Sequence, residues 1–369
     1  MLVCVPPLVV FVVDPYQVFH RSWLPRVFFY KDNERYQVAG LLKQYLAHDN
    51  SFDSVIVGSS VSANIAASDM QSTLDWRALN VSMRAASLQE RYFVLQQALA
   101  SPKIRRVLLE VYASDIQTDT GFVTEQSGFP VYLYSDSWFD KRRYVFNFSV
   151  FYHALVLSKL NGYLDFLPVS VSAWIQPAAD GWHEGDVDDW NVWITDPGHA
   201  EEFERFNQPE NLARKREALA RAREEQHRTA WEWRRDYPFT MQKTCIVDIV
   251  RAHPDVQFVI WFAPVSLARY ASENAMDTIN QQVELRRFLV KSLAALSHVQ
   301  IYGFDNVLDF TANLHNYMDY SHYTQERQRW VLREMAQGHY RMDEDTVDAY
   351  VEQLRRNILL FDIPTPVLR

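Results

Sequence analysis

Three polar residues at two distant points in the sequence could carry out acyl-group chemistry. Ser60 ends a Gly-Ser-Ser turn that follows a short apolar run at residues 54–57, and Asp319 and His322 form a DxxH motif much later in the chain. In such a set the carboxylate orients the imidazole, the imidazole takes the serine proton, and the serine oxygen attacks a carbonyl carbon. Each motif alone is weak, because a Gly-Ser-Ser turn or an isolated DxxH motif is more often structural than catalytic.

The hydrophobic pattern predicts elements that would bring these residues together. Buried strands are expected at 54–57, 106–111, 256–262 and 299–302, and helices at 88–101, 241–252, 277–297 and 324–337. Strands that alternate with helices predict an α/β fold with a parallel sheet covered on both faces. Ligand sites in such sheets lie at the carboxyl ends of the strands, where Ser60 falls. The loop before the last of these helices would bring Asp319 and His322 to the same edge.

Residues 119–240 break this alternation, and we interpret them as a large aromatic-rich insertion in an α/β domain that spans 14–369. Residues 209–235 are expected to form a charged helix with a solvated face. Trp182, Trp190 and Trp193 would either stack on sugar rings or pack the insertion onto the main domain. The acidic residues of this interval match no calcium-binding loop, so we expect them to be solvated. They are Glu184, Asp186, Asp188 and Asp189.

The first 13 residues, MLVCVPPLVVFVV, are almost entirely apolar. A membrane-spanning helix needs ~20 such residues, and this run also contains two prolines and lacks the positive start of a signal peptide. We interpret residues 1–13 as the remnant of a membrane anchor, which would place the domain outside the cytoplasm. A buried N-terminal strand or arm is the alternative.

The composition excludes several classes of protein. Hydrophobic residues make up 48% and charged residues 22% of the 369, which excludes a disordered chain. The net charge of −9 argues against a nucleic-acid partner, whose phosphates require a basic surface. With only Cys4 and Cys245, a disulfide scaffold is not expected. The sequence contains no zinc cluster, P-loop or dinucleotide-binding glycine motif, so we predict neither a metal nor a cofactor.

Several segments along nearly the whole chain resemble the membrane-anchored SGNH/GDSL-like proteins of bacterial envelope modification. The layout is similar to that of DltD-like proteins of teichoic-acid D-alanylation and of the alginate O-acetylation proteins. The matching segments are DPY at 14–16, SFDSVIVGSS at 51–60, LNVS at 79–82, PVYLY at 130–134, WFAPVS at 261–266 and NYMDYSHY at 316–323. The resemblance implies an SGNH-hydrolase-like (flavodoxin-like) sheet flanked by helices. It also implies that Ser60 is the nucleophile and that Asp319 and His322 are the acid and the base.

The sequence departs from the family pattern at the oxyanion hole, the set of donors that binds the developing negative charge on the substrate oxygen. The family has a glycine after the second strand and an asparagine after the third, whereas here residues 80–86 contain no glycine and Ser114 stands at the asparagine position. The hole would then use the Ser60 N–H with Asn80, Ser82 or Ser114, or it would be weak. One such donor is worth ~10²–10³ in rate. Asn80 could instead cap the end of its strand.

The resemblance implies an extracytoplasmic Ser-His-Asp acyltransferase or esterase that acts on O-acyl groups of a cell-envelope polysaccharide. The expected partners are a polysaccharide or acyl-donor substrate, a membrane O-acyltransferase, and the membrane itself through the N-terminus. The alternative is a non-catalytic glycan-binding or scaffold member of an envelope acylation complex, which the altered oxyanion pattern suggests. The complete set of Ser60, Asp319 and His322 favours the enzyme.

Overall fold

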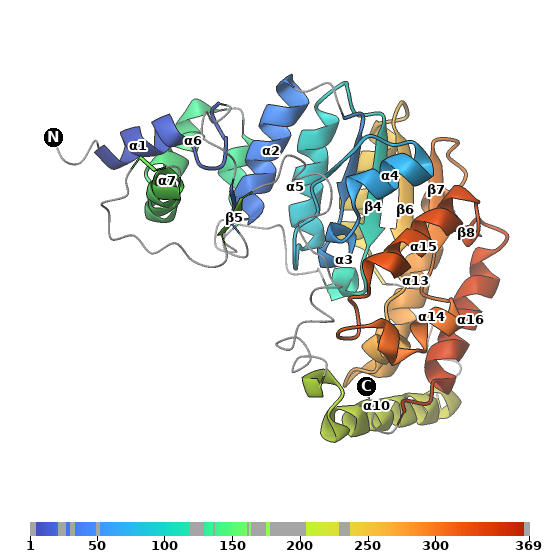
Figure 1. Ribbon diagram of the computed structural model, residues 1–369. Helices are drawn as coiled ribbons and strands as arrows, with labels where there is room; N and C mark the ends of the chain where they lie inside the picture. The colour runs from blue at the N-terminus through green and yellow to red at the C-terminus, as the bar shows by residue number, and fades with distance from the viewer. Residues whose placement is uncertain are drawn as a thin grey trace.

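The computed structural model describes residues 5–20, 27–29, 34–48, 52–117, 129–135, 137–160, 162–163, 175–177, 204–228 and 237–364 (Figure 1). Cys4, the three tryptophans at 182–193 and the acidic residues at 184–189 lie outside these ranges, so the predictions made for them are not addressed by the structure.

The core of the protein is a six-stranded mixed sheet with the order β3-β2-β4-β6-β7-β8. The first five strands in this order are parallel, and β8 runs antiparallel to β7. Their bounds are β3 Ala78–Asn80, β2 Ser54–Val57, β4 Arg106–Val111, β6 Gln257–Phe262, β7 Val299–Gly303 and β8 Arg341–Met342. Numbered along the chain, the parallel strands therefore have the order 2-1-3-4-5. The predicted α/β class and the four predicted strands are confirmed.

Helices cover both faces of the sheet, which explains why its strands are continuous apolar runs. One face packs against α5 (Leu88–Leu99), α12 (Ile249–Ala252), α13 (Ala275–Leu293) and α16 (Val347–Leu360). The other face packs against α3 (Ser60–Ala63), α4 (Ala67–Leu74), α14 (Leu308–Thr311) and α15 (Gln325–Ala336). All four residues of β2 are buried. The strand that precedes Ser60 is thus held rigidly between two layers of helices.

The predicted helices are confirmed, with one irregularity. The segment predicted at 241–252 begins as α11 (Thr240–Gln242), continues through a π-helical stretch at Lys243–Asp248 and ends as α12. Helix α15 begins after Thr324, whose side chain accepts a hydrogen bond from the backbone N–H of Arg327. It ends before Gly338, whose φ of +75° is a left-handed conformation that glycine adopts without strain.

Three helices form a lobe beside the sheet: α1 (Val5–Val13), α6 (Trp138–Val145) and α7 (Phe148–Leu160) (Figure 1). Their shared core includes Val10, Tyr144 and Val150, all fully buried. Asp14 ends α1 inside the lobe, where its carboxylate accepts hydrogen bonds from three backbone N–H groups and from the Tyr144 hydroxyl. The alternative of a buried strand is wrong for residues 5–13, which are helical. Across the described ranges, the structure contains no helix of sufficient length and apolar character to traverse a bilayer.

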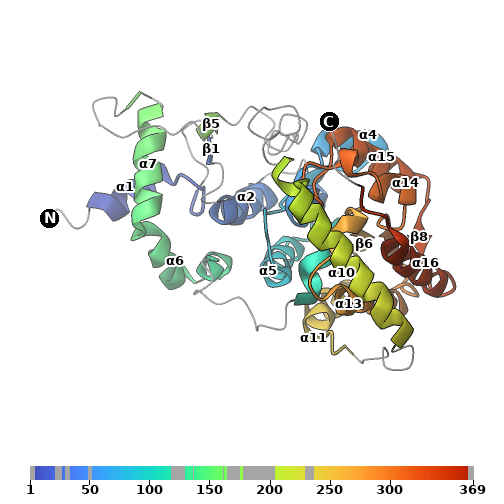
Figure 2. The same ribbon diagram turned by 90° about the horizontal axis from the view of Figure 1, so that it is seen from below.

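The interval 119–240 contributes to two separate places. Its first part supplies α6 and α7 to the lobe, together with a 3-10 turn at Val131–Tyr134 that packs between the lobe, α2 (Glu34–His48) and α5. Its later part supplies α10 (Pro209–Arg228), which packs on α13 and α16 (Figure 2). A two-stranded antiparallel pair joins β1 (Val27–Phe29) to β5 (Ile175–Pro177).

Candidate active site

Ser60, His322 and Asp319 form a continuous hydrogen-bonded relay. The Ser60 Oγ lies 2.7 Å from His322 Nε2, and His322 Nδ1 lies 2.7 Å from Asp319 Oδ2. These distances confirm the prediction that the three residues come together at one edge of the sheet. With the proton of the neutral imidazole on Nδ1, the ring donates to Asp319 and accepts the proton of the Ser60 hydroxyl, as a general base must.

The topology of the sheet places Ser60 where α/β proteins bind ligands. Ser60 begins α3 directly after β2 and the two residues that follow it. The strand order reverses between β2 and β4, since the next strand along the chain, β3, lies on the far side of β2. A crevice opens outside the carboxyl ends of the strands at such a reversal. The relay therefore lies at the edge of the sheet where the strand order reverses.

The loop that carries Asp319 holds the carboxylate in its ionised form. Asp319 Oδ1 accepts the backbone N–H groups of Ser321 at 2.7 Å and His322 at 2.8 Å. Burial alone would raise the pKa of Asp319, but the charge of the His322 imidazolium and these hydrogen bonds outweigh it and lower the pKa below its usual value of 3.8. An ionised Asp319 would stabilise an imidazolium at His322.

A buried glutamate fixes the turn that presents Ser60. Glu110 lies in the middle strand β4 and is fully buried. Its carboxylate accepts the N–H and the hydroxyl of Ser59 at 2.8 and 2.7 Å, and the N–H and the hydroxyl of Ser62 at 3.2 and 2.5 Å. These are the residues on either side of the nucleophile segment. Gly58 is required here, because a Cβ at this position would come within 2.4 Å of Glu110 Oε2.

Glu110 was not among the residues predicted for the site, although its position in an apolar strand is unusual. It interrupts the buried apolar strand Arg106–Val111 with an acidic side chain, and a buried acid must find hydrogen-bond donors. The donors are the serines of the nucleophile turn, which lie on the adjacent strand's extension. An acidic residue inside an apolar strand therefore indicates a buried hydrogen-bonding site near that strand.

The backbone N–H of Ser60 is an available oxyanion donor. It begins α3, and the first N–H groups of a helix have no partner inside the helix. The neighbouring N–H groups of Ser59 and Ser62 are bonded to Glu110, whereas no bond to the N–H of Ser60 is observed within the described ranges. The first turn of α3 thus leaves one donor beside the nucleophile itself.

Asn80, one of the predicted oxyanion donors, uses its side-chain amide in hydrogen bonds within the protein. Its amide nitrogen donates to the carbonyl oxygens of Ser62 at 2.9 Å and Ile65 at 3.0 Å, and its oxygen accepts the N–H of Ser82. Both amide hydrogens are therefore committed to holding α3 against the end of β3. The alternative interpretation of Asn80 as a structural cap agrees with these contacts.

Ser82 is the stronger side-chain candidate. The segment after β3 runs beside the nucleophile turn, because the N–H of Val81 bonds to the carbonyl of Ile56 and the N–H of Met83 bonds to the carbonyl of Gly58. Side chains alternate along this extended segment, so Ser82 faces the same side as Asn80, towards α3. The Ser82 hydroxyl is buried without a hydrogen-bond partner in the described part of the chain. A buried hydroxyl is costly when unpaired, and a substrate oxygen would satisfy it.

Ser114 lies in the 3-10 turn Ala113–Gln117 that follows β4, at the same edge of the sheet as Ser60. It is partly buried, and the structure records no hydrogen bond from its side chain to the relay. The neighbouring Tyr112 contacts the loop that carries Asp319 and His322, since its hydroxyl donates to Ser321 Oγ at 2.6 Å. Burial raises the pKa of the Tyr112 phenol, which keeps the donated proton in place.

Two cationic side chains contact tyrosines that adjoin the Asp319–His322 loop, in contrast to the acidic character of the whole chain. Arg269 lies on the 3-10 turn Leu267–Tyr270 after β6, is exposed, and reaches the Tyr112 hydroxyl. No ion pair between Arg269 and a carboxylate is found within the described ranges. Lys215 of α10 stacks its ammonium 4.3 Å from the centre of the Tyr320 ring and donates to the carbonyl of Ala268 at 2.7 Å. The interval 119–240 thus supplies a second cation, which packs on the tyrosine that follows Asp319 in the sequence.

The electrostatic environment of Lys215 is unfavourable for its charge. Burial, followed by repulsion from Arg269 and Arg214, lowers the pKa of Lys215 to about 8. An anion bound near these cations would relieve the repulsion. We call Arg269 and Lys215 the cationic rim.

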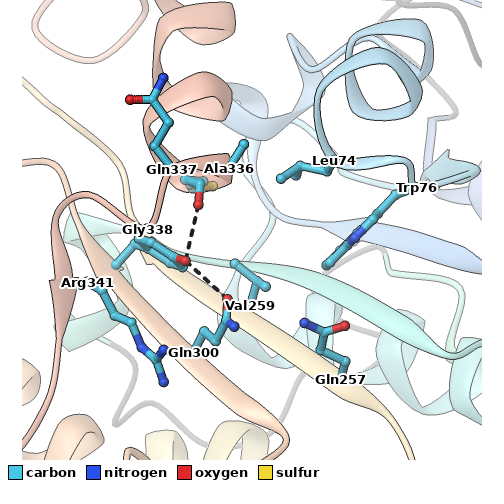
Figure 3. A pocket seen from close by; sticks show the side chains of 11 residues that line it. Leu74, Trp76, Gln257, Val259, Gln300, Ala336, Gln337, Gly338 and Arg341 are labelled. Atoms are coloured by element: carbon cyan, nitrogen blue, oxygen red, sulfur yellow. Dashed lines mark hydrogen bonds between the residues drawn. The ribbon is translucent and has the colours of Figure 1, made fainter.

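A separate cavity of about 330 Å³ lies at the other end of the sheet (Figure 3). Gln257 and Gln300, which line it, occupy the starts of β6 and β7, whereas the relay lies at the carboxyl ends of the strands. Tyr302 joins the lining by hydrogen bonds to Gln300 Oε1 and to the carbonyl of Met335. This cavity does not belong to the relay.

The chain matches no protein-family model, and no curated protein matches it at a significant level. The chemistry of the site therefore has to be argued from the geometry of its own residues. That geometry comprises the hydrogen-bonded Ser60, His322 and Asp319, the N–H of Ser60, and the buried, unpaired hydroxyl of Ser82 on the segment that runs along Ile56 and Gly58. The cationic rim adds two positive charges.

Proposed function

We propose that the protein is a serine acyltransferase or esterase that acts on O-acyl esters. The observation that carries this proposal is the relay itself, in which Ser60, His322 and Asp319 are joined by two hydrogen bonds of 2.7 Å. Ser60 attacks the acyl carbonyl while His322 takes its proton. His322 then gives that proton to the departing alcohol, leaving the acyl group esterified to Ser60. Water or a second hydroxyl group, activated by His322, completes the reaction and frees the serine.

The strand order and the placement of the relay support the finer assignment to an SGNH-hydrolase-like fold. The order 2-1-3-4-5 is that of flavodoxin-like sheets. The nucleophile follows the first strand of the sheet, and the Asp-x-x-His motif precedes the last helix that packs on the nucleophile's face. In this assignment the oxyanion hole consists of the Ser60 N–H and the Ser82 hydroxyl, which together take the place of the family's glycine and asparagine.

We infer from the sequence resemblance that the ester is carried by a cell-envelope polysaccharide, that the protein acts outside the cytoplasm, and that a membrane O-acyltransferase is its partner. The cationic rim supports an acceptor or donor that bears an anionic group near the ester, because Arg269 and Lys215 attract negative charge to the mouth of the site. No cofactor is required for this chemistry.

The proposal is tested by ester turnover with the parent protein and the Ser60→Ala variant. The substrates are p-nitrophenyl acetate and an acetylated anionic oligosaccharide, each with and without an unacetylated oligosaccharide as acceptor. We expect turnover by the parent, transfer in the presence of acceptor, and a loss of several orders of magnitude in Ser60→Ala with unchanged thermal stability. An inactive parent that still binds the oligosaccharide would instead support the non-catalytic scaffold suggested by Ser114.

A further inference from the structure

The lobe formed by α1, α6 and α7 exposes apolar side chains that its own fold does not need. Each helix already buries one side against the others, through residues such as Val10, Tyr144 and Val150. On the outward side, five large apolar residues are between 62% and 81% exposed: Leu8, Trp138, Phe139, Phe146 and Phe148. Outside these three helices and the residues between α6 and α7, the large apolar side chains exposed in the described part of the chain are Tyr163, just after α7, and Leu308, Tyr340 and Leu360. Such a concentration marks an interaction surface.

Exposed residues of α1 and α6 contact each other. The ring of Phe11 on α1 lies 6.0 Å from the ring of Trp138 on α6. Helix α1 packs against both α6 and α7, and Figure 2 shows the three helices grouped at the end of the molecule that is remote from α10. We call Leu8, Phe11, Trp138, Phe139, Phe146 and Phe148 the aromatic surface.

The charges of the lobe differ from those of the rest of the chain. Helix α6 carries the consecutive bases Lys141, Arg142 and Arg143, and the guanidinium of Arg142 lies 3.5 Å from the centre of the Phe139 ring. Helices α1 and α7 contain no acidic residue, and the single acid of α6, Asp140, accepts a hydrogen bond from Ser135. A chain with a net charge of −9 therefore has a basic region beside its most exposed apolar side chains.

Apolar and aromatic side chains bordered by bases match the interface of an anionic bilayer. Trp and Phe enter the boundary between headgroups and acyl chains, while Lys and Arg remain among the headgroups. Each base near an anionic surface strengthens binding. A second copy of the chain is a poorer occupant, because a symmetric contact through this surface would bring two runs of Lys141–Arg143 together.

We propose that the aromatic surface docks the protein on the surface of an anionic lipid bilayer. The contact lies in the plane of the membrane interface and involves α6 and α7 from the interior of the chain, in addition to the apolar N-terminal segment. It leaves the relay, which lies at the edge of the sheet beyond α2 and α5, outside the lipid (Figure 1).

The test is co-sedimentation of the full chain with vesicles of phosphatidylglycerol and phosphatidylethanolamine, compared with vesicles of phosphatidylcholine alone. We expect binding to the anionic vesicles that weakens at high salt. The triple variant Trp138→Ser, Phe139→Ser, Phe148→Ser should reduce the affinity at least about ten-fold, because it removes three inserted rings. The matched control Leu308→Ser, Tyr340→Ser, Leu360→Ser changes exposed apolar residues elsewhere and should bind like the parent.

A charge variant gives a second measurement that does not depend on the folding of the triple variant. Arg142→Glu with Arg143→Glu should lower binding to anionic vesicles while leaving the circular dichroism spectrum unchanged. Ser60→Ala should bind like the parent, because docking does not involve the relay. Equal binding by the parent, the triple variant and the charge variant would overturn the proposal. So would a concentration-dependent dimer, seen by light scattering, that the triple variant abolishes while vesicles remain unbound.

Discussion

The carboxylate of Glu110 holds Ser59 by both of its donors, accepting the backbone N–H at 2.8 Å and the hydroxyl at 2.7 Å. Ser59 directly precedes Ser60, so these hydrogen bonds anchor the Ser60 turn to the central strand β4. In the proposed mechanism Glu110 is a positioning residue, because it binds Ser59 and Ser62 and has no recorded contact with Ser60, His322 or Asp319.

Replacing Glu110 by leucine should impair both the fold and the reaction. The donors of Ser59 and Ser62 would lose their acceptor in a buried place, which we expect to cost about 2–4 kcal/mol in the free energy of unfolding. Glu110→Gln should recover much of this stability, because its amide oxygen still accepts and its NH₂ can donate to the Ser59 hydroxyl. The checks are chemical denaturation and kcat measured on the folded fraction. A kcat equal to that of the parent in Glu110→Leu would show that Glu110 serves stability alone.

Ser82→Ala separates catalysis from stability. The Ser82 hydroxyl is buried and unpaired, so removing it should leave the unfolding free energy unchanged or slightly higher. If the hydroxyl donates to the oxyanion, kcat should fall by ~10²–10³ with little change in KM. Asn80→Ala should show the opposite pattern, a loss of stability through its contacts with Ser62 and Ile65. An unchanged kcat in Ser82→Ala would remove Ser82 from the oxyanion hole.

Asp319→Asn tests the orientation of the imidazole. An amide NH₂ facing His322 Nδ1 favours the wrong tautomer, and we expect a loss on the order of 10⁴-fold in kcat. The pKa of Asp319 is lowered in the folded protein, so its ionised form contributes stability that is present above the unfolded value and lost as the pH falls through the folded value. The difference in unfolding free energy between parent and variant should therefore shrink as the solution is acidified below about pH 4. A difference independent of pH would contradict this.

The cationic rim predicts a preference for anionic esters. Arg269→Ala should raise KM for an anionic ester roughly ten-fold or more and leave a neutral ester unaffected. Arg333→Ala, an exposed arginine on α15 outside the rim, is the matched control. In the parent, KM for the anionic ester should also rise as the pH passes about 8, because Lys215 then loses its proton. Equal effects on both esters would mean that the rim has no role in binding charge.

Much of the sheet could be predicted from the sequence, because parallel strands buried on both faces are short apolar runs bounded by turn residues. The strand β8 could not be predicted in this way, since only Arg341 and Met342 form it and they pair antiparallel with β7. Likewise, the destination of residues 129–160 depends on packing with α1, a contact between segments more than a hundred residues apart. Local periodicity carries no information about such a partner.

The relay could be predicted because its chemistry requires particular residue types at the carboxyl edge of the sheet, and Ser60, Asp319 and His322 satisfied that requirement. The sequence could not decide whether Asn80 or Ser82 is the better oxyanion donor, because that depends on which side chain is already hydrogen-bonded in the fold. Asn80 donates to two carbonyl oxygens, whereas the Ser82 hydroxyl has no partner in the described structure. Both facts depend on the path of the chain around α3.

If Ser60 is an activated nucleophile, covalent labelling measures its reactivity directly. The folded parent protein is treated with a fluorophosphonate, and the modified peptide is identified by mass spectrometry. We expect a single adduct on Ser60 that is lost in His322→Asn and kept in folded Ser59→Ala. A folded parent that leaves Ser60 unmodified under conditions that label a control serine esterase would contradict it.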